Sequence, residues 1–380
     1  MEEEGFVFET GKLFYNPNMR FSRSFGSLSV GAIGNRESGL RGGRRNVDDR
    51  IGEDISVLDG FAASGIRGLR YAKENRNVKS VTLLDIWKIA PAIIEKNAKK
   101  NKIKNAEAFN ADFNEFAIKN QFDFIEIDPF GTPIQFLNNA FYSFRKSRGG
   151  YISLTATDVA VLCGENTKAC LKKYGAKNLR NEFTHEIGTR VLLKKIGDFA
   201  SQFDFGMEPL YSISDRHYIK ILLKITRSAE KASEIPRTLG YVSYCFHCGY
   251  RETGKFPNRV CGNCKKDMDY AGPLWLGELH ERKFLAKMKK LNEKRDYADK
   301  KELDKTLDLL IGEAGMPAFY YEMHDLCARL RVERIPRIDE FISELRKKGF
   351  RAVRTHFCEK GIKTDAGLKE IEALLQNGEI

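Results

Sequence analysis

Short apolar runs bounded by turn residues recur along the first part of the chain, and they alternate with segments that carry apolar side chains on one face. The runs predict strands and the one-sided segments predict helices, because side chains repeat about every two residues on a strand face and about every 3.6 on a helix face. Predicted strands span residues 55–58, 81–84, 107–110, 122–127, 151–155, 208–213 and 218–226, and predicted helices span 134–144 and 187–203. This alternation predicts an α/β domain with a mostly parallel seven-stranded sheet, closed by an antiparallel pair.

The pattern changes near Pro236, after the last predicted strand. We therefore expect two domains, residues 1–236 and 237–380, which is reasonable for a chain of 380 residues with 42% hydrophobic side chains. Residues 158–186 form an insertion within the first domain.

The second domain is predicted to be mostly helical after a cysteine-bearing start. Residues 278–308 are highly charged, which predicts helices that mostly face solvent. Helices at 321–330 and 335–348 then precede a basic strand at 350–357. Helix, turn, helix and basic strand are typical of a winged helix, although a plain helical appendage has the same pattern.

Four predicted strands end in an aspartate, namely Asp59, Asp85, Asp112 and Asp128. Asp59 opens a turn of small residues that leads through Gly65 into a helix, where a ligand can approach the backbone. Aspartates at strand ends often cap the next helix, but four at the edge where parallel sheets bind ligands indicate a site. The turn matches neither a dinucleotide fingerprint nor a P-loop. We interpret the edge as a site for S-adenosyl-L-methionine, whose ribose and amino group suit carboxylates.

Asp128 also begins the tetrapeptide Asp128-Pro129-Phe130-Gly131. Its carboxylate and a backbone carbonyl can accept both hydrogens of an exocyclic amino group, while the Phe130 ring stacks on the heterocycle. Asp-Pro after a strand also starts ordinary turns, and a phenylalanine can belong to a core. Beside a donor site, the tetrapeptide indicates methylation of a nucleobase amino group, in which Asp128 orients the nitrogen more than it acts as a base.

Two cysteine pairs with metal-ligand spacing lie at the start of the second domain. Cys245 and Cys248 are separated by two residues, as are Cys261 and Cys264. Four thiolates at this spacing predict a tetrahedral zinc site that is structural because it leaves no open position. Redox dithiols or free thiols are the alternative, and His247 could compete as a ligand.

The chain has a net charge of +12 and a pI of about 9.2, which favours a polyanionic partner. The basic residues gather in three runs, although any one run is also typical of a solvated face. The runs are Arg20, Arg23, Arg36, Arg41, Arg44 and Arg45 in a segment rich in glycine and serine; Lys168, Lys172, Lys173, Lys177 and Arg180; and Arg346, Lys347, Lys348, Arg351 and Arg354. Three runs around a base-handling site favour a nucleic acid.

The remaining expectations concern location and assembly. No apolar run reaches the roughly 18 residues of a membrane span, and residues 1–4 are acidic rather than typical of a signal peptide. We expect a cytoplasmic protein that is a monomer with no obligate protein partner.

Several long motifs resemble the tRNA guanine-26 N2-dimethyltransferases over nearly the whole chain. The matching motifs are Phe14-Tyr15-Asn16-Pro17 with Arg23, Asp128-Pro129-Phe130-Gly131, Thr155-Ala156-Thr157-Asp158, Leu162-Cys163-Gly164, Ala169-Cys170-Leu171-Lys172-Lys173-Tyr174-Gly175-Ala176-Lys177, the cysteine pairs and Arg354-Thr355-His356-Phe357. The resemblance implies a class I, Rossmann-like methyltransferase fold and tRNA as the substrate. It also implies two successive transfers to the N2 of guanine 26, which produce N2,N2-dimethylguanosine.

The resemblance also implies roles for single residues. Arg23, Asp85 and Asp112 would hold the donor, Phe14 and Phe130 would enclose the base, and Asp128 would face its amino group. With the turn residues, the candidate cofactor-binding set is Arg23, Asp59, Ser64, Gly65, Arg67, Asp85, Asp112 and Phe113, and the candidate catalytic set is Phe14, Asp128, Pro129 and Phe130.

One region departs from the family pattern, and two alternatives stay open. Ser22-Arg23-Ser24 stands where the family usually has Asn-Arg-Asp, which puts the local geometry in doubt. A related enzyme could methylate an amino group in rRNA, DNA or protein glutamine. A zinc-stabilised RNA-binding protein without turnover is the second alternative.

Overall fold

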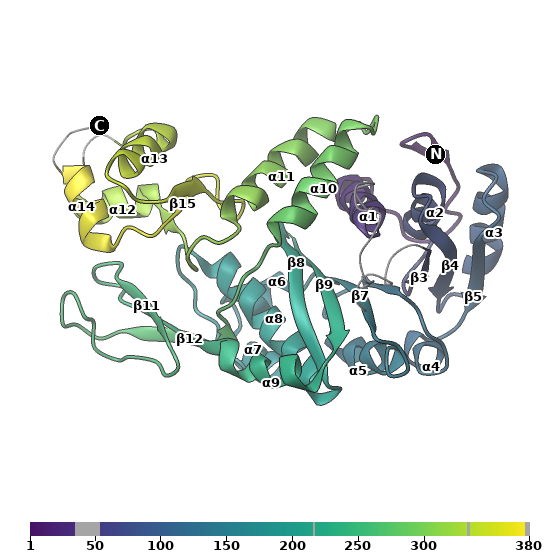
Figure 1. Ribbon diagram of the computed structural model, residues 1–380, viewed down its shortest axis with the longest axis horizontal. Coiled ribbons are helices and arrows are strands. Elements are labelled where there is room, and N and C mark those ends of the chain that lie inside the picture. The colour runs from purple at the N-terminus through teal and green to yellow at the C-terminus, as the bar shows by residue number, and fades with distance from the viewer. Residues whose placement is uncertain (35–53, 216, 333–334, 377–380) are drawn as a thin grey trace, which may run out of the picture.

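A sheet of seven strands organises the molecule in the computed structural model, which describes residues 1–34, 54–215, 217–332 and 335–376 (Figure 1). The strand order is β5-β4-β3-β6-β7-β9-β8, with β9 antiparallel to both neighbours and the other pairs parallel. The strands are β3 (Ile55–Asp59), β4 (Val78–Asp85), β5 (Ala106–Asn110), β6 (Phe124–Ile127), β7 (Gly149–Ala156), β8 (Phe205–Asp215) and β9 (Tyr218–Arg227). The predicted seven-stranded sheet is confirmed. Every described helix is too short or too polar to cross a membrane.

The two faces of the sheet bury different residues, because neighbouring side chains of a strand point in opposite directions. Leu58 and Ile125 belong to one core, and the preceding residues Val57 and Phe124 belong to the other. Helices α4 (Phe113–Ala117), α5 (Ile134–Ser143) and α8 (Thr184–Gln202) contribute to the first core, and α1 (Arg20–Ala32), α2 (Ile66–Glu74) and α3 (Ala90–Lys100) contribute to the second. Parallel strands covered on both faces read as nearly continuous apolar runs, which is why the sequence predicts them well.

Helix α1 was not predicted, because glycine and serine are poor helix formers. The structure buries every residue from Ser22 to Ala32, so tertiary packing outweighs that low propensity. Small side chains allow close neighbours: a Cβ on Gly26 would lie 2.4 Å from the Tyr71 hydroxyl oxygen. Four members of the first basic run, Arg36, Arg41, Arg44 and Arg45, lie outside the described residues.

The charged segment at 278–308 corrects another prediction. Helices α10 (Arg282–Glu293) and α11 (Lys300–Glu313) pack against each other, and α10 packs against α1, instead of mostly facing solvent. Leu285, Met288 and Leu307 are fully buried in the second core. The prediction was wrong because the high density of charges concealed one apolar face on each helix.

Two small antiparallel sheets lie at the opposite end of the molecule from β5 and α3 (Figure 1). One has the order β11-β10-β12, and the other has the order β13-β15-β14 with a core of its own. Their elements are β10 (Leu239–Tyr244), β11 (Arg251–Gly254), β12 (Asp269–Trp275), β13 (Tyr321–Glu322), α12 (Met323–Leu330), α13 (Ile338–Lys347), β14 (Ala352–Arg354), β15 (Gly361–Thr364) and α14 (Leu368–Gln376). The predicted strand at 350–357 is therefore shorter than expected and pairs with an unpredicted one.

The remaining elements connect these parts. They are β1 (Glu2–Glu3), β2 (Phe6–Val7), the 3-10 helix η1 (Pro17–Met19), α6 (Val159–Leu162) and α7 (Thr167–Tyr174) in the insertion, and α9 (Ala229–Thr238) beside the predicted domain boundary.

A buried polar cluster joins the large sheet to the C-terminal part. Glu186 on α8 accepts a hydrogen bond from Lys363 at 2.9 Å, and Glu313 accepts one from the His356 ring at 2.7 Å. A ring nitrogen of His280 lies within 4.8 Å of ligand-type atoms of Glu313 and His356. Neither ring nitrogen of His280 has a hydrogen-bond partner among the described residues. Lys363 also lies 3.6 Å from Glu313, so the negative charge is already balanced, and we interpret the cluster as a polar core rather than a metal site.

His280 makes stability depend on pH. Burial lowers its pKa to about 3, so the folded chain keeps the ring neutral, whereas the unfolded chain protonates it below the ordinary value of 6.5. Its contribution to stability is therefore lost as the pH falls below about 6.5, and it amounts to a loss on the order of 2 kcal/mol at pH 5. We expect denaturant unfolding of His280→Gln to depend less on pH between about 5 and 7 than wild type. The exposed His324→Gln variant is the control; an equal pH dependence in His280→Gln and wild type would contradict the assignment.

Candidate functional site

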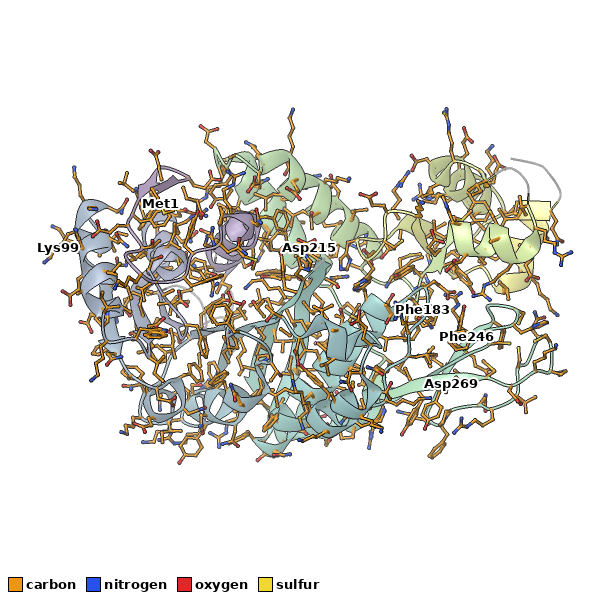
Figure 2. All side chains as sticks on the ribbon, turned by 180° about the vertical axis from the view of Figure 1, so that it is seen from behind. Met1, Lys99, Phe183, Asp215, Phe246 and Asp269 are labelled. Carbon is orange, nitrogen blue, oxygen red and sulfur yellow. The ribbon has the colours of Figure 1, made fainter. Side chains whose placement is uncertain are left out.

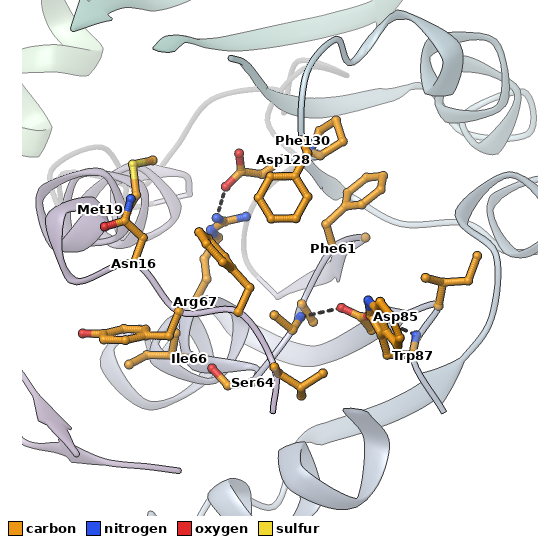
Figure 3. Close-up of a pocket in the computed structure, with 18 of the residues that line it drawn as sticks. Asn16, Met19, Phe61, Ser64, Ile66, Arg67, Asp85, Trp87, Asp128 and Phe130 are labelled. Carbon is orange, nitrogen blue, oxygen red and sulfur yellow. Dashed lines mark hydrogen bonds and ion pairs between the residues drawn. The ribbon is translucent and has the colours of Figure 1, made fainter. Parts of the chain in front are cut away.

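A cavity of about 960 Å³ opens at the carboxyl ends of strands β3 to β6 (Figure 3). It lies beside β3, where strand order reverses and open α/β sheets bind ligands. Residues 12–16 and Met19 of the N-terminal segment form a further wall, and His217 and Tyr218 line it from the start of β9. Of the predicted residues, those that line it are Phe14, Arg23, Ser64, Arg67, Asp85, Asp112, Phe113, Asp128, Pro129 and Phe130. The structure thus brings most of the predicted site together.

Two strand-end carboxylates at one side of the cavity are held rigidly. Asp85 accepts hydrogen bonds from the backbone N–H groups of Ala63 at 2.8 Å and Trp87 at 2.9 Å. Asp112 caps helix α4 through the N–H of Asn114 at 2.8 Å. Both carboxylates therefore have the ordinary turn and capping roles and also face the cavity, which fixes their oxygens in advance for a ligand.

Asp59 and Gly65 are not among the residues that line the cavity. Asp59 is fully buried and accepts a hydrogen bond from the N–H of Gly68 at 3.1 Å. Burial raises its pKa above the ordinary value, although the positive charge of Arg67 opposes this. Gly65 has a φ of +80°, which favours glycine, where helix α2 begins. Both residues shape the turn from behind.

Arg67 contacts the tetrapeptide that begins at Asp128, a contact that the sequence did not predict for it. Its guanidinium forms an ion pair with Asp128, and its Nη1 lies 3.8 Å from Asp59 Oδ1 (Figure 3). Burial alone would lower the pKa of Arg67, but Asp59 and Glu126 outweigh burial and raise it. One half-buried, charged guanidinium is therefore shared between two strand-end carboxylates.

A second buried pair lies behind this one. Glu126 accepts hydrogen bonds from Lys220 at 2.6 Å and from the Tyr71 hydroxyl at 3.0 Å. Burial alone would raise the pKa of Glu126, but Lys220 and Arg67 outweigh it and lower the pKa. The charged groups behind the cavity are thus paired, and this pairing fixes the positions of the Arg67 and Asp128 side chains.

Two exposed aromatic rings stand at the entrance. Phe130 is 78% exposed and Phe14 is 58% exposed. Their ring centroids lie 5.0 Å apart at an interplanar angle of 80°, so they meet edge to face. A base stacked between them needs about 7 Å between parallel rings, from two contacts of about 3.5 Å. The rings must therefore separate and turn before they can enclose a base.

Arg23 lines the cavity, but its guanidinium is already paired. It donates to Glu3 at 2.8 Å and to the Asn16 carbonyl at 3.1 Å, and it lies over the Tyr15 ring. Burial alone would raise the pKa of Glu3, and Arg23 and Arg70 outweigh it and lower the pKa. Arg23 therefore fixes the segment that carries Phe14.

Sequence reasoning missed several lining residues. Trp87 and Ile86 are exposed and directly follow Asp85, so an apolar pair after a strand-end acid was the available signal. His217 and Tyr218 come from the hairpin of β8 and β9, and Met19 comes from an unpredicted helical segment. These three depend on tertiary packing, and no local pattern indicates them.

The four predicted cysteines converge. Cys245 Sγ lies 3.5 Å from Cys264 Sγ, and Cys248 Sγ lies 3.6 Å from Cys261 Sγ. All four sulfur atoms lie within 4.8 Å of one another. Tetrahedral zinc with Zn–S bonds of about 2.3 Å separates its ligands by about 3.8 Å, so the donor set fits a zinc ion. His247 is not part of this group.

Known proteins are similar to this chain over nearly its whole length. Residues 1–376 match the family described as N2,N2-dimethylguanosine tRNA methyltransferase. The tRNA (guanine(26)-N(2))-dimethyltransferase of Methanobrevibacter smithii is 35% identical over 96% of this chain and 91% of its own length. The tRNA (guanine(26)-N(2)/guanine(27)-N(2))-dimethyltransferase of Aquifex aeolicus is 33% identical over 94% and 88%. The structure of Trm1 from Pyrococcus horikoshii with S-adenosyl-L-methionine has a TM-score of 0.82 and 31% identity, and the alignment covers 96% of each chain.

The position of the Arg67 guanidinium between two carboxylates leads to a prediction about stability. Arg67→Met keeps side-chain volume but leaves Asp59 buried without its cation, so the free energy of unfolding should fall by about 3–5 kcal/mol. Denaturant unfolding measures this, with the exposed Arg76→Met as the control, which should change it by less than about 0.5 kcal/mol. Equal stability of Arg67→Met and wild type would show that the pair does not hold the site together.

Proposed function

The chain belongs to the N2,N2-dimethylguanosine tRNA methyltransferase family, and from that membership we propose that it transfers methyl groups from S-adenosyl-L-methionine to the N2 of guanine 26 in tRNA. Two successive transfers give N2,N2-dimethylguanosine. The observation that carries the proposal is a single cavity that joins rigid strand-end carboxylates to Asp128 and an exposed pair of phenylalanines.

The donor half suits S-adenosyl-L-methionine. Asp85 would accept from the ribose hydroxyls and Asp112 from the adenine amino group, since the backbone already fixes both carboxylates. Phe113 adds an apolar wall and can lie there because Gly60 has no side chain: a Cβ on Gly60 would lie 2.4 Å from its ring. When bound, the donor supplies an electrophilic methyl group on a positively charged sulfur.

Asp128 orients the amino group. Its Oδ2 is engaged by Arg67, which leaves Oδ1 for one N–H of guanine, and the Pro129 carbonyl accepts the other. These bonds direct the nitrogen lone pair, which is otherwise delocalised into the ring, toward the methyl group. The nitrogen becomes acidic once methylated, so Asp128 needs only to accept or stabilise its proton. The ion pair with Arg67 holds the carboxylate as a hydrogen-bond acceptor, which agrees with that role.

Phe14 and Phe130 hold the extruded base. Removing a stacked guanine from folded RNA costs a few kcal/mol, and stacking between the two rings offsets this cost. In the second transfer the nitrogen has one N–H left, which stays bonded to Asp128 while the first methyl group turns away. The exposed rings leave room for that rearrangement.

The C-terminal half stabilises and extends the RNA-binding surface. The four cysteines would hold a structural zinc ion, because they leave no ligand position open. Residues 321–376 follow the order strand, helix, helix, strand, strand, helix, and the two helices followed by two strands support a winged-helix-like unit as the second part of this half.

Replacing Asp128 separates chemistry from donor binding. Asp128→Asn removes the negative charge opposite the amino group, and we expect single-turnover methyl transfer to tRNA at least about 100-fold slower. Donor binding, measured by calorimetry, should stay near wild type. Asp85→Asn is the matched control with the opposite outcome: weaker donor binding but nearly normal transfer at saturating donor. Equal loss of donor binding in Asp128→Asn would refute its role.

The zinc proposal has its own test. Cys261→Ser should lose zinc, measured by elemental analysis, and lower the melting temperature by at least about 5 °C, because metal binding and folding are coupled. Cys358→Ser, outside the cluster, should keep the zinc content and the melting temperature of wild type. Full zinc content in Cys261→Ser would rule out the four-cysteine site.

A further inference from the structure

The three-stranded sheet that carries the cysteines has an unusual surface. We call residues 237–276 the cysteine ribbon; all of them are described. Its exposed charged residues are Arg237, Lys255, Arg259, Lys265 and Lys266, with Asp267 as the one exposed acid. This excess of positive charge favours contact with a polyanion.

An aromatic side chain projects from the middle of this basic surface. Phe256 lies between β11 and β12 and is 83% exposed, and Val260 nearby is also exposed. An apolar ring of this size left in water forgoes roughly 2 kcal/mol of burial. A ring so exposed on a loop between basic residues can stack on a base of a bound nucleic acid.

Hydrogen bonds to the strands of the ribbon hold the loop that carries Phe256 in place. Asn258 donates its backbone N–H to Ser243 at 2.8 Å and its side-chain amide to Glu252 at 2.8 Å. Lys255 donates to the carbonyl of Leu239 at 3.1 Å. Phe256 is thus presented on a fixed base, so a partner that covers it would order few new groups on binding.

A basic segment connects the ribbon to the catalytic loop. Lys177, just beyond α7, exchanges backbone hydrogen bonds of 2.8 Å with Gly272 of β12. The exposed basic residues of this segment are Lys168, Lys172, Lys173 and Arg180. These residues belong to the insertion of the first domain, which this pairing joins to the cysteine ribbon.

The same end of α7 is also tied to the loop that carries the tetrapeptide. The Tyr174 hydroxyl lies 3.0 Å from Thr132 Oγ1 and donates to Asp158 at 2.7 Å. The neighbouring Thr157 N–H donates to the Gly131 carbonyl at 2.9 Å. The basic segment is therefore joined both to the loop of the tetrapeptide and to the cysteine ribbon. The ribbon lies away from α3, as β11 and β12 show in Figure 1 and the labelled Phe246, Asp269 and Lys99 show in Figure 2.

We propose that the loop at 255–260 is a second RNA contact, in which Phe256 stacks on an unpaired base while the α7 lysines bind the phosphates between that base and the target guanine. The proposal rests on the proposed function, because it assigns this contact to the same tRNA. RNA is favoured over a protein partner because the apolar ring is surrounded by exposed lysines and arginines, and stacking accepts any base.

The test compares three variants of Phe256 in the full-length protein. Phe256→Ala should raise the dissociation constant for an unmodified tRNA transcript by roughly five- to hundredfold, which corresponds to one lost base stack. The rate at saturating tRNA should stay unchanged, because the ring is remote from the cavity. Phe256→Tyr should bind as wild type, and Phe256→Leu should bind as weakly as Phe256→Ala. A short RNA hairpin that carries only the target guanine should bind wild type and all three variants equally.

Controls separate stacking, charge and chemistry. Phe109→Ala, on the opposite edge of the large sheet, should not affect binding. Lys168→Gln with Lys172→Gln should reduce the dependence of affinity on salt by about one unit of slope each, and Phe256→Ala should leave that slope unchanged. Wild-type affinity in Phe256→Ala, or in Phe256→Leu, would overturn the inference. Failure of the wild-type enzyme to methylate tRNA would instead overturn the proposed function.

Discussion

The ion pair between Arg67 and Asp128 is the interaction on which the catalytic end of the cavity depends. Asp59 and Asp128 end neighbouring strands, and two carboxylates so close in a buried region would repel each other without a cation between them. Arg67 supplies that cation from the first turn of α2. The ion pair leaves one Asp128 oxygen for the substrate and makes the carboxylate an acceptor rather than a strong base. Under the proposed function, a residue first interpreted as part of the donor site thus positions the carboxylate that faces the acceptor.

Buried ion pairs also hold the N-terminal segment in place. Arg23 is paired with Glu3, Glu3 is also paired with Arg70 of α2 at 2.8 Å, and these contacts hold the chain that carries Phe14 over the cavity. Helix α1 can lie between α2 and α10 because its glycines and serines allow close packing. The wall of the cavity that carries Phe14 therefore rests on charge pairs and small residues as well as on the second core.

The predictions from sequence succeeded where a local pattern carries the information. Buried parallel strands are continuous apolar runs, their ends meet at one edge, and thiolate spacing indicates a metal site, so Asp85, Asp112, Asp128 and the four cysteines were found. Helix α1, the buried faces of α10 and α11, and the pairing of Arg67 were missed because each depends on a neighbour distant in sequence. Asp59 was expected at the ligand and instead lies behind the turn, since the pattern gives the strand end but not the direction of its side chain.

The pH dependence of a single methyl transfer tests the central claim most directly, namely that Asp128 orients the amino group and is not a titrating base. With enzyme in excess and donor saturating, the account predicts a single-turnover rate that is nearly constant between about pH 6 and pH 9, because a carboxylate paired with Arg67 is already ionised throughout that range. A rate that rises tenfold per pH unit to a plateau near neutral pH would show that a group must lose a proton before transfer, and it would contradict the account.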